Sequence, residues 1–338
     1  MSWKFWSLWK RSPEPPMPSP ESPDWERALI NRLALEHLRD QRRRQRWGTV
    51  FKLSILVYLV GLLAVGLGRE LWKGVETGKD HTALVEVKGV IAADSDASAD
   101  RVIAALREAF KADHVKGVVL RINSPGGSPV QSGYINDEVR RLKEKYKKDK
   151  GKDLPVYAVA VDLCASGGYY VAVAADKIYA DRASLVGSIG VRIDSFGLQD
   201  AMQKLGVERR LLTAGKNKGI LDPFSPLSED QRQFIQGVLD DLHRQFVAAV
   251  KAGRGDRLRG GNELFSGLFW SGDQAVGLGL VDGLGSASYV ARELIGAETL
   301  VDYTQRRSVL EGLAERLGTT AASAFLSVFA QAGSATLR

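Results

Sequence analysis

Two glycine-rich turns, each between an apolar strand-like run and a helical stretch, constrain the fold of this chain most strongly. The first turn is Asn123-Ser-Pro-Gly-Gly-Ser-Pro129, which follows the apolar run Val115–Ile122 and precedes a helical pattern over residues 130–146. Proline and paired glycines at a strand end force a tight turn with exposed backbone amides. Gly126 or Gly127 is therefore a candidate oxyanion donor, although an ordinary strand-to-helix connection fits the same residues.

The second turn contains Ser166, followed by two glycines. It lies between a valine-rich run over residues 153–161, typical of a buried strand, and the apolar stretch Ala172–Ala175, typical of a buried helix. A serine in this position lies at a helix N-terminus, where free N–H groups favour negative charge. A serine nucleophile needs that environment, but serine is also a common helix N-cap. Strands that alternate with helices around two such turns predict an α/β domain with a shared pocket.

Charge and cysteine content exclude several classes of protein. The net charge is +7, yet residues 1–52 hold 11 Lys and Arg against 6 Asp and Glu, which leaves only +2 for the rest of the chain. A basic tail of this kind does not predict a nucleic-acid-binding domain. Cys164 is the only cysteine, so no intramolecular disulfide forms. The four histidines are scattered without metal-ligand spacing, and we predict neither a metal nor a cofactor.

An apolar segment near the N-terminus predicts a membrane anchor. Eighteen residues, Val50–Leu67, contain only three polar side chains and follow the run Arg42–Arg46. Trp47 and Trp72 flank the segment as interfacial anchors do. A cleaved signal peptide is the alternative, but its charged region is usually short, whereas nearly fifty residues precede this segment. The arginines keep the N-terminus in the cytoplasm, so the remainder lies outside the inner membrane, in the periplasm of a bacterium.

The chain therefore divides into five predicted parts. In the folded part we expect a helix over Phe196–Leu205, a strand over Glu208–Thr213, and a capping box at Ser228–Gln231 that opens a helix to about Gly253. Apolar residues recur every four positions along that last helix and predict a buried face. They are Phe234, Val238, Leu242, Phe246 and Val250. The parts are a cytoplasmic tail (1–48), an anchor (49–68), a linker (69–81), the folded domain (82–300) and a C-terminal tail (301–338).

A serine nucleophile also needs a base, and no histidine lies near either turn in the sequence. The Ser/Lys arrangement is the remaining variant. It requires a neutral lysine, and burial favours that form by lowering a lysine pKa by up to roughly 3–5 units. Lys218 is a candidate because it has no acidic residue within three positions, and Lys216 competes with it. A solvated loop lysine is the simpler interpretation of either, and spacing alone does not choose between them.

Five short motifs together resemble the signal peptide peptidase A family, in its order and spacing, over residues 82–300. The resemblance implies a crotonase-like, Clp-protease-like spiral of ββα units and a Ser/Lys dyad. It does not extend to the first 48 residues. The motifs are Asn123-Ser-Pro-Gly-Gly127, Ala165-Ser-Gly-Gly-Tyr169, Gly187-Ser-Ile-Gly190, Gly215-Lys-Asn-Lys218 and Trp270-Ser-Gly-Asp-Gln-Ala275.

The resemblance also implies roles for individual residues. Ser166 matches the nucleophile, Lys218 the general base, and Ser188 a hydroxyl that helps to orient the lysine. Gly126 or Gly127 matches the oxyanion loop, together with the N–H of Ser166. Members of the family are membrane-bound oligomers that cut residual signal peptides and other membrane-embedded or unfolded segments. Peptide substrates, a membrane location and self-assembly are therefore expected here.

Two other functions fit parts of the same pattern. A crotonase-type enzyme acting on acyl-CoA thioesters would use the same glycine turns, but it would need a pocket carboxylate and a cytoplasmic location. A catalytically silent membrane scaffold would need only the fold and its self-assembly.

Overall fold

The computed structural model describes residues 78–305 without a gap, and residues 22–23, 25, 29–30, 47, 49–58 and 60–61. The chain forms two units, Met1–Val75 and Glu76–Arg338. Residues 49–58 and 60–61, inside the predicted anchor, are helical. Among the residues described, no helix combines the length and the apolar character needed to cross a membrane. The rest of the predicted anchor, and nearly all of both predicted tails, lie outside the described residues.

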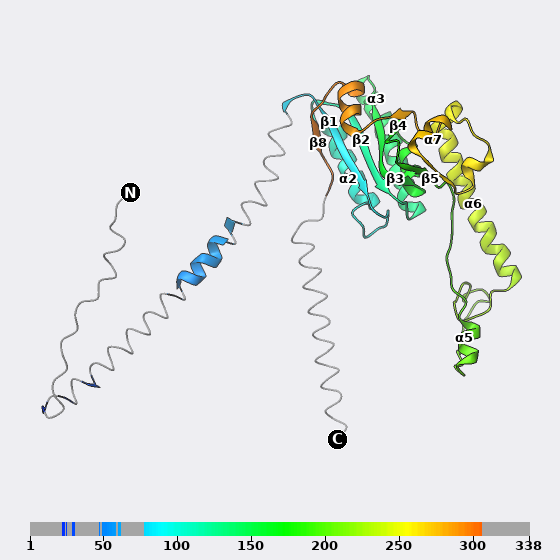
Figure 1. The fold of residues 1–338 in the computed structure, drawn as a ribbon, viewed down its shortest axis with the longest axis horizontal. Helices are drawn as coiled ribbons and strands as arrows, with labels where there is room; N and C mark the ends of the chain where they lie inside the picture. The colour runs from blue at the N-terminus through cyan, green and yellow to red at the C-terminus, as the bar shows by residue number, and fades with distance from the viewer. Residues whose placement is uncertain are drawn as a thin grey trace. The chain divides into compact units, whose positions relative to one another are not determined.

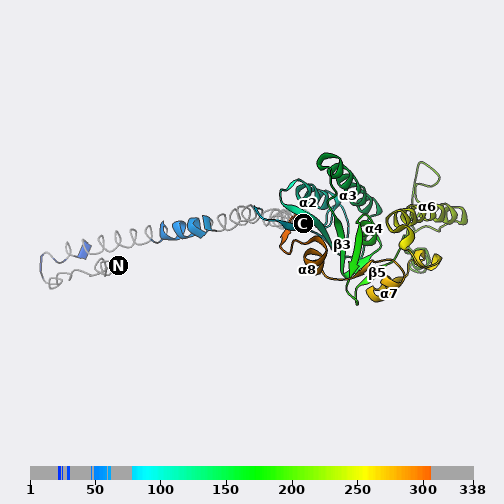
Figure 2. The same cartoon turned by 90° about the horizontal axis from the view of Figure 1, so that it is seen from above.

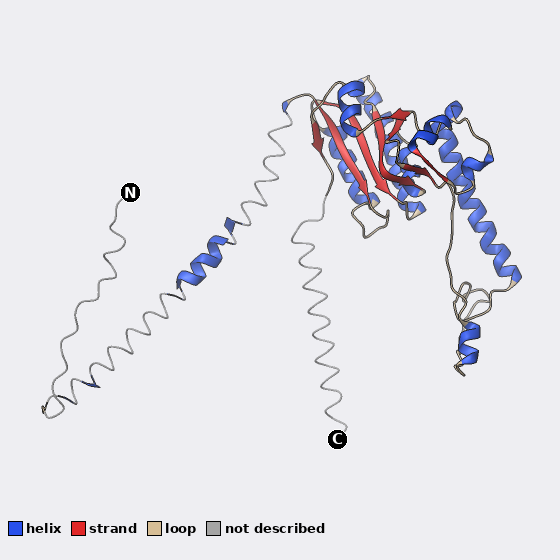
Figure 3. Ribbon diagram, in the orientation of Figure 1, coloured by secondary structure: helices blue, strands red, loops and turns tan. Residues whose placement is uncertain are grey.

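The second unit is built on one eight-stranded sheet (Figure 3). Its main path runs β6-β5-β3-β2-β1-β8, while β4 pairs with β3 and with β7. Every pair is parallel except β5 with β6. The predicted α/β class is therefore confirmed. The strands are β1 (His81–Lys88), β2 (Val115–Ser124), β3 (Val156–Ala165), β4 (Lys177–Ala180), β5 (Leu185–Gly187), β6 (Phe269–Ser271), β7 (Gly283–Leu284) and β8 (Leu300–Asp302).

Helices cover both faces of the sheet, as Figures 1 and 2 show. Three of them, α2, α3 and α4, pack on one face with the C-terminal half of α6, and α8 with the π-helical turn after it packs on the other. The helices are α2 (Ala99–Lys111), α3 (Pro129–Lys150), α4 (Gly167–Ala172), α5 (Gln199–Lys204), α6 (Glu229–Arg254), α7 (Gly272–Gly277) and α8 (Ala287–Tyr289), with 3₁₀ turns at Gly255–Arg257 and Asn262–Phe265 and the π turn at Val290–Ile295.

Alternation along the central strands explains the two packed layers. In β2, Val118 and Leu120 point to the face with α2–α4, and Val119 points to the face with Val290. All four side chains are fully buried. Strands buried on both faces read as continuous apolar runs, which is typical of parallel sheets. The C-terminal ends of β2 and β3 therefore lie side by side, and each leads into one of the glycine turns.

Several predicted elements are confirmed, with shifted ends. The two apolar runs before the glycine turns form β2 and β3, and the capping box at Ser228 begins α6 as predicted. The helix expected over Phe196–Leu205 is shorter, as α5. The strand expected over Glu208–Thr213 does not form, because these residues are exposed and no described strand pairs with them.

The predicted buried face of α6 is only half buried. Phe246 and Val250 pack into the core, but 65% of Phe234 and 40% of Val238 remain exposed. The prediction was therefore wrong for the N-terminal half of the helix within a single chain. That half extends away from the sheet (Figure 1).

Candidate active site

Ser166 follows β3 directly and caps the N-terminus of α4. Its backbone has φ 51° and ψ −122°, a conformation that non-glycine residues rarely adopt and that stores strain. The surroundings fix it: its N–H donates to the Gly187 carbonyl at 2.8 Å, and its carbonyl accepts from the Tyr170 N–H at 2.9 Å. Its side chain remains partly exposed between buried neighbours. This turn presents a hydroxyl at the start of a buried helix.

The turn at Gly126 and Gly127 packs directly against Ser166. Both glycines have positive φ, 97° and 151°. A Cβ on Gly126 would lie 2.6 Å from the Gly167 nitrogen and 2.8 Å from the Ser166 Cβ, so a side chain has no room there. A Cβ on Gly167 would lie 3.2 Å from the Gly127 nitrogen. The structure therefore brings the predicted nucleophile and the predicted oxyanion turn together.

The hydrogen bonds of this region distinguish engaged N–H groups from available ones. Ser166 and Gly126 are engaged, because their N–H groups donate to the Gly187 carbonyl and to the Ser124 hydroxyl, the latter at 3.1 Å. The expectation that the Ser166 N–H serves the oxyanion is therefore not supported in this arrangement. Within residues 78–305, we find no acceptor for the N–H groups of Gly127 and Gly167. The two available donors thus lie where the glycine turn packs against the start of α4.

Ser188 lies on the other side of the same turn. It follows Gly187, whose carbonyl holds the Ser166 N–H, and its own N–H donates to the Leu268 carbonyl at 2.7 Å. Its φ is 51°, as at Ser166. A Cβ on Gly187 would lie 2.9 Å from the ring of Trp270, which explains why glycine stands there. The predicted supporting serine therefore lies beside the predicted nucleophile.

Lys216 and Lys218 lie in a separate region, the arm, which we define as residues 192–228 between β5 and α6. Both lysines are exposed. The arm makes contacts within itself: an ion pair joins Arg209 to Asp222 at 2.8 Å, and the Leu198 N–H donates to the Pro223 carbonyl at 2.7 Å. Figure 1 shows α5, the helix of the arm, well apart from the sheet. Among residues 78–305, no hydrogen bond or ion pair joins the side chain of either lysine to the turn that holds Ser166.

Many apolar side chains of the arm face solvent. Leu212 is 95% exposed and Phe196 is 80% exposed. Apolar surface gathered in one region usually marks a contact surface. The large exposed apolar residues of the arm are Ile193, Phe196, Leu198, Leu205, Val207, Leu211, Leu212, Phe224 and Leu227.

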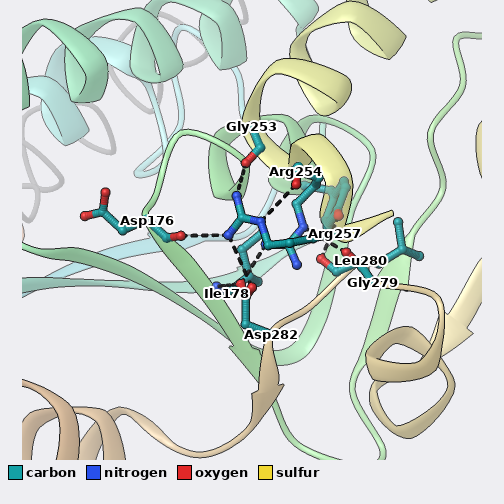
Figure 4. Close-up of polar contacts among 9 residues, drawn as sticks. Asp176, Ile178, Gly253, Arg254, Arg257, Gly279, Leu280 and Asp282 are labelled. Atoms are coloured by element: carbon teal, nitrogen blue, oxygen red, sulfur yellow. Dashed lines mark hydrogen bonds and ion pairs between the residues drawn. The ribbon is translucent and has the colours of Figure 1, made fainter. Parts of the chain in front are cut away.

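A buried ionic network anchors the other end of α6 (Figure 4). The Arg254 guanidinium, only 1% exposed, contacts Asp282 at 2.6 Å and donates to the Gly279 carbonyl at 2.9 Å. Arg257 contacts Asp282 at 3.2 Å and donates to the Asp176 carbonyl at 2.8 Å. Burial acts to raise the pKa of Asp282, but hydrogen bonds from Arg254 and the backbone outweigh it and leave that pKa below its ordinary value.

The same network meets the helix of Ser166. The Tyr169 hydroxyl, fully buried, donates to the Leu280 carbonyl at 2.7 Å, one residue beyond the Gly279 carbonyl that Arg254 contacts. Sequence reasoning missed the roles of Tyr169, Arg254 and Asp282, because each depends on partners at least 25 positions away. No local motif signals such a network. Among the described residues, no group of three or more His, Cys, Asp or Glu is placed to hold a metal.

Comparison with known proteins gives a family match. Residues 147–300 match the model of peptidase family S49. A presumed protease of Synechocystis, slr0021, is 31% identical over 216 residues, which cover 64% of this chain and 74% of that protein. A presumed signal peptide peptidase SppA of Enterococcus faecium is 34% identical over 190 residues, or 56% of this chain and 53% of that protein.

One further relative has a different name. The Na(+)/H(+) antiporter NhaA of Brucella abortus is 41% identical over 207 residues, which cover 61% of this chain. The match spans 27% of that protein, so this chain corresponds to about a quarter of its length. The transport activity in that name is a property of the Brucella protein.

Proposed function

Because the chain belongs to peptidase family S49, we propose that it is a serine endopeptidase with Ser166 as nucleophile and Lys218 as general base. One observation carries the proposal. The strained Ser166 turn packs against Gly126 and Gly127, and the N–H groups of Gly127 and Gly167 remain available beside its side chain. A hydroxyl beside two preorganised donors is the arrangement that acyl transfer needs.

The proposed reaction begins when the Ser166 oxygen attacks a peptide carbonyl carbon and the Lys218 amine takes the hydroxyl proton. The electron pair of the carbonyl moves to its oxygen, and the Gly127 and Gly167 N–H groups donate to this oxyanion. A single such donor is typically worth about 2.7–4 kcal/mol. The intermediate collapses as the protonated lysine gives its proton to the leaving amine and the C–N bond breaks.

The acyl-enzyme is then hydrolysed. Lys218 takes a proton from a water molecule, and the resulting hydroxide adds to the ester carbonyl. The bond to the Ser166 oxygen then breaks as the protonated lysine returns a proton to that oxygen. In this proposal the Ser188 hydroxyl orients the lysine amine, and its position one residue after Gly187, whose carbonyl accepts the Ser166 N–H, supports that role. These steps use only side chains, backbone N–H groups and water, so the proposal includes no metal and no cofactor.

In this proposal Lys218 acts in the active site of a second copy of the chain. A lysine base has to be neutral, and water stabilises the charged ammonium of an exposed lysine. The exposed apolar side chains of the arm, with Phe234 and Val238 of α6, form a surface that a neighbouring copy would cover. We therefore place Lys218 in the site of a neighbouring copy, where contact would exclude water. The expected homo-oligomer becomes a condition of activity in this proposal.

The remaining parts of the proposal rest on the family and the sequence. We propose the crotonase-like ββα spiral, a peptidase domain over residues 82–300, and a single anchor at 49–68 that leaves the N-terminus in the cytoplasm and this domain in the periplasm. The proposed substrates are residual signal peptides and other membrane-embedded or unfolded segments. The name of the E. faecium relative supports this substrate class.

Ser166→Ala tests the proposal. In detergent-solubilised protein with synthetic signal peptides, we expect cleavage to fall by at least about 10⁴-fold, because the variant lacks the proposed nucleophile. Mass spectrometry of the peptides measures the loss, and thermal unfolding checks that the variant folds. In the wild type, a serine-directed fluorophosphonate should label Ser166. Cleavage that survives in Ser166→Ala contradicts the proposal, and an assembled but unlabelled wild type favours a scaffold.

A further inference from the structure

Ser124 is a buried serine at the end of β2, two residues before Gly126. Its hydroxyl accepts the Gly126 N–H at 3.1 Å, in a fully buried position. The same residue lies against the helix of the nucleophile, because a Cβ on Gly168 would lie 3.0 Å from the Ser124 carbonyl oxygen and 3.3 Å from its Cβ. Ser124 therefore contacts both turns of the proposed site.

Backbone hydrogen bonds hold the glycine turn on the side that faces Ile91. Ile91 forms an isolated parallel bridge with Gly127. The Ile91 N–H donates to the Gly126 carbonyl at 2.9 Å, and the Ser128 N–H donates to the Ile91 carbonyl at 2.8 Å. In a parallel bridge of this form the N–H of the central residue, Gly127, points away from the partner strand. It therefore points to the side where Gly167 lies.

The Gly126 N–H, by contrast, depends on a side-chain acceptor, the Ser124 hydroxyl. Without an acceptor, the buried Gly126 N–H would lose its hydrogen bond. The peptide plane before Gly126 would then be free to rotate, and the plane after it would be held only by the Ile91 N–H on the Gly126 carbonyl. Glycines with φ of 97° and 151° offer little resistance to such a rotation. Such a rotation would act on the plane between Gly126 and Gly127 against its one remaining hydrogen bond, and would turn the Gly127 N–H away from Ser166.

We propose that Ser124 is a positioning residue: its hydroxyl holds the Gly126 N–H so that the Gly127 N–H is the donor that faces the oxyanion. The proposal rests on the proposed peptidase function, and it assigns the two adjacent glycines different tasks. Gly126 gives its N–H to Ser124, and Gly127 gives its N–H to the substrate. Ser124 itself does not touch the reacting atoms.

A merely structural role for Ser124 predicts different measurements. A buried serine that only satisfies a backbone donor would affect stability, and the active fraction would fall while kcat per active site stayed constant. A residue that positions an oxyanion donor changes kcat per site with little change in KM, because the oxyanion exists only in the transition state. Substitution of such a residue also weakens the binding of peptide aldehydes, which form a tetrahedral adduct with the serine.

The experiment uses Ser124→Ala and Ser124→Cys in the full chain, with Ser184→Ala as control. Cysteine keeps the approximate shape and offers only a weak acceptor, so it carries the test if the alanine variant does not fold. Ser184 is another buried serine whose hydroxyl accepts a backbone N–H, that of Asp181 at 2.9 Å. Active sites are counted by fluorophosphonate titration, and kcat, KM and the inhibition constant of a peptide aldehyde are measured.

We expect kcat per site to fall about 10- to 10³-fold in both Ser124 variants, with the larger value set by complete loss of one oxyanion donor. Aldehyde binding should weaken by a similar factor, and KM should change less than threefold. Ser184→Ala should retain the wild-type kcat and inhibition constant. Wild-type values in a folded Ser124 variant would overturn the positioning role while leaving the peptidase proposal intact. Failure of the wild type to cleave peptides or to label at Ser166 would instead overturn the peptidase proposal.

Discussion

The residues next to Ser166 in the chain are mostly buried, whereas the segment that leads up to Lys218 is exposed. Cys164, Ala165, Gly167 and Gly168 are buried and are fixed by the sheet, by α4 and by the glycine turn. Residues 211–218 are all exposed. The proposed nucleophile and its proposed oxyanion donors therefore belong to a core that one chain completes by itself. The proposed base belongs to a surface that one chain leaves uncovered.

The contrast has a physical consequence for when the enzyme would be active. Exposed apolar side chains gain roughly 25 cal/mol per Å² when they are covered, so the arm favours association. In the proposed mechanism, the contact that covers them also removes water from Lys218. A single chain would then hold a formed oxyanion site without a usable base. Activity would depend on assembly, which limits peptide cleavage by unassembled copies.

Mixed oligomers test this division most directly. Ser166→Ala and Lys218→Ala, each alone, should be inactive. When the two are co-expressed with different tags and purified as mixed oligomers, a site with an intact serine and an intact lysine from a neighbour forms at random in about a quarter of the positions. We therefore expect peptide cleavage to recover to about a quarter of the wild-type rate.

The control for this recovery is a mixture of Ser166→Ala with the double variant Ser166→Ala/Lys218→Ala, which contains no nucleophile and should stay inactive. If verified mixed oligomers of the two single variants remain inactive, the serine and the lysine act within one chain, or Lys218 is not the base. Either explanation would contradict the proposal that a neighbouring copy supplies Lys218 as the base.

Leu212→Asp examines the arm as a contact surface. Burial of a leucine is worth about 1.5–3 kcal/mol, so replacing it by a charge should weaken association by at least about tenfold. Because Leu212 is 95% exposed in the single chain, the monomeric variant should unfold at the same temperature as the monomeric wild type. Sedimentation velocity measures the assembly, and cleavage should fall in parallel with it. Lys152→Asp, on an exposed loop after α3, is the control and should alter neither.

The nucleophile region was predictable from sequence because its signals are local. Strand, glycine turn and helix follow one another within about fifteen residues at both turns, and the conformations depend mainly on glycine, proline and the apolar runs beside them. Parallel strands that end together then bring both turns to one edge of the sheet. The capping box at Ser228 was predictable for the same reason, since a cap involves only four consecutive residues.

The arm was harder to predict because its structure depends on what lies against it. We predicted a strand at Glu208–Thr213 from the sequence, but a strand needs a neighbour for its hydrogen bonds, and none pairs with this segment among residues 78–305. Regular spacing identified an apolar face on α6, yet spacing does not tell whether the same chain covers it. The engaged Ser166 N–H was also missed, because its acceptor, Gly187, lies 21 positions away.

Glu138 offers a smaller test on the buried side of the comparison. A hydrogen bond from Arg141 lowers the pKa of Glu138 to about 2 from an ordinary 4.5; burial opposes this shift, and Arg107 adds to it. A lowered folded-state pKa stabilises the fold above about pH 4.5, and this stabilisation is lost as the pH falls toward 2. We expect at most about 3 kcal/mol, and less in practice because both arginines are half exposed.

Glu138→Gln measures this contribution. Its free energy of unfolding, from urea titrations, should lie below that of the wild type at pH 6, and the difference should shrink steadily between pH 5 and pH 2. Cleavage at neutral pH should change little, since Glu138 joins α3 to α2 and touches neither turn. A difference that stays constant with pH would show that the carboxylate charge contributes nothing to the stability of the core around Ser166.

Lys216→Ala is expected to have the smallest effect and decides between the two lysines of the arm. Both are exposed in the single chain and lie two positions apart, so burial does not distinguish them; the family motif assigns the base to Lys218. Substitutions at exposed positions usually change free energies by less than about 0.5 kcal/mol. We therefore expect cleavage by Lys216→Ala within about a factor of two of the wild type, measured beside the inactive Lys218→Ala. An inactive Lys216→Ala beside an active Lys218→Ala would transfer the role of base to Lys216. The arm would still supply the base, because both lysines lie on it.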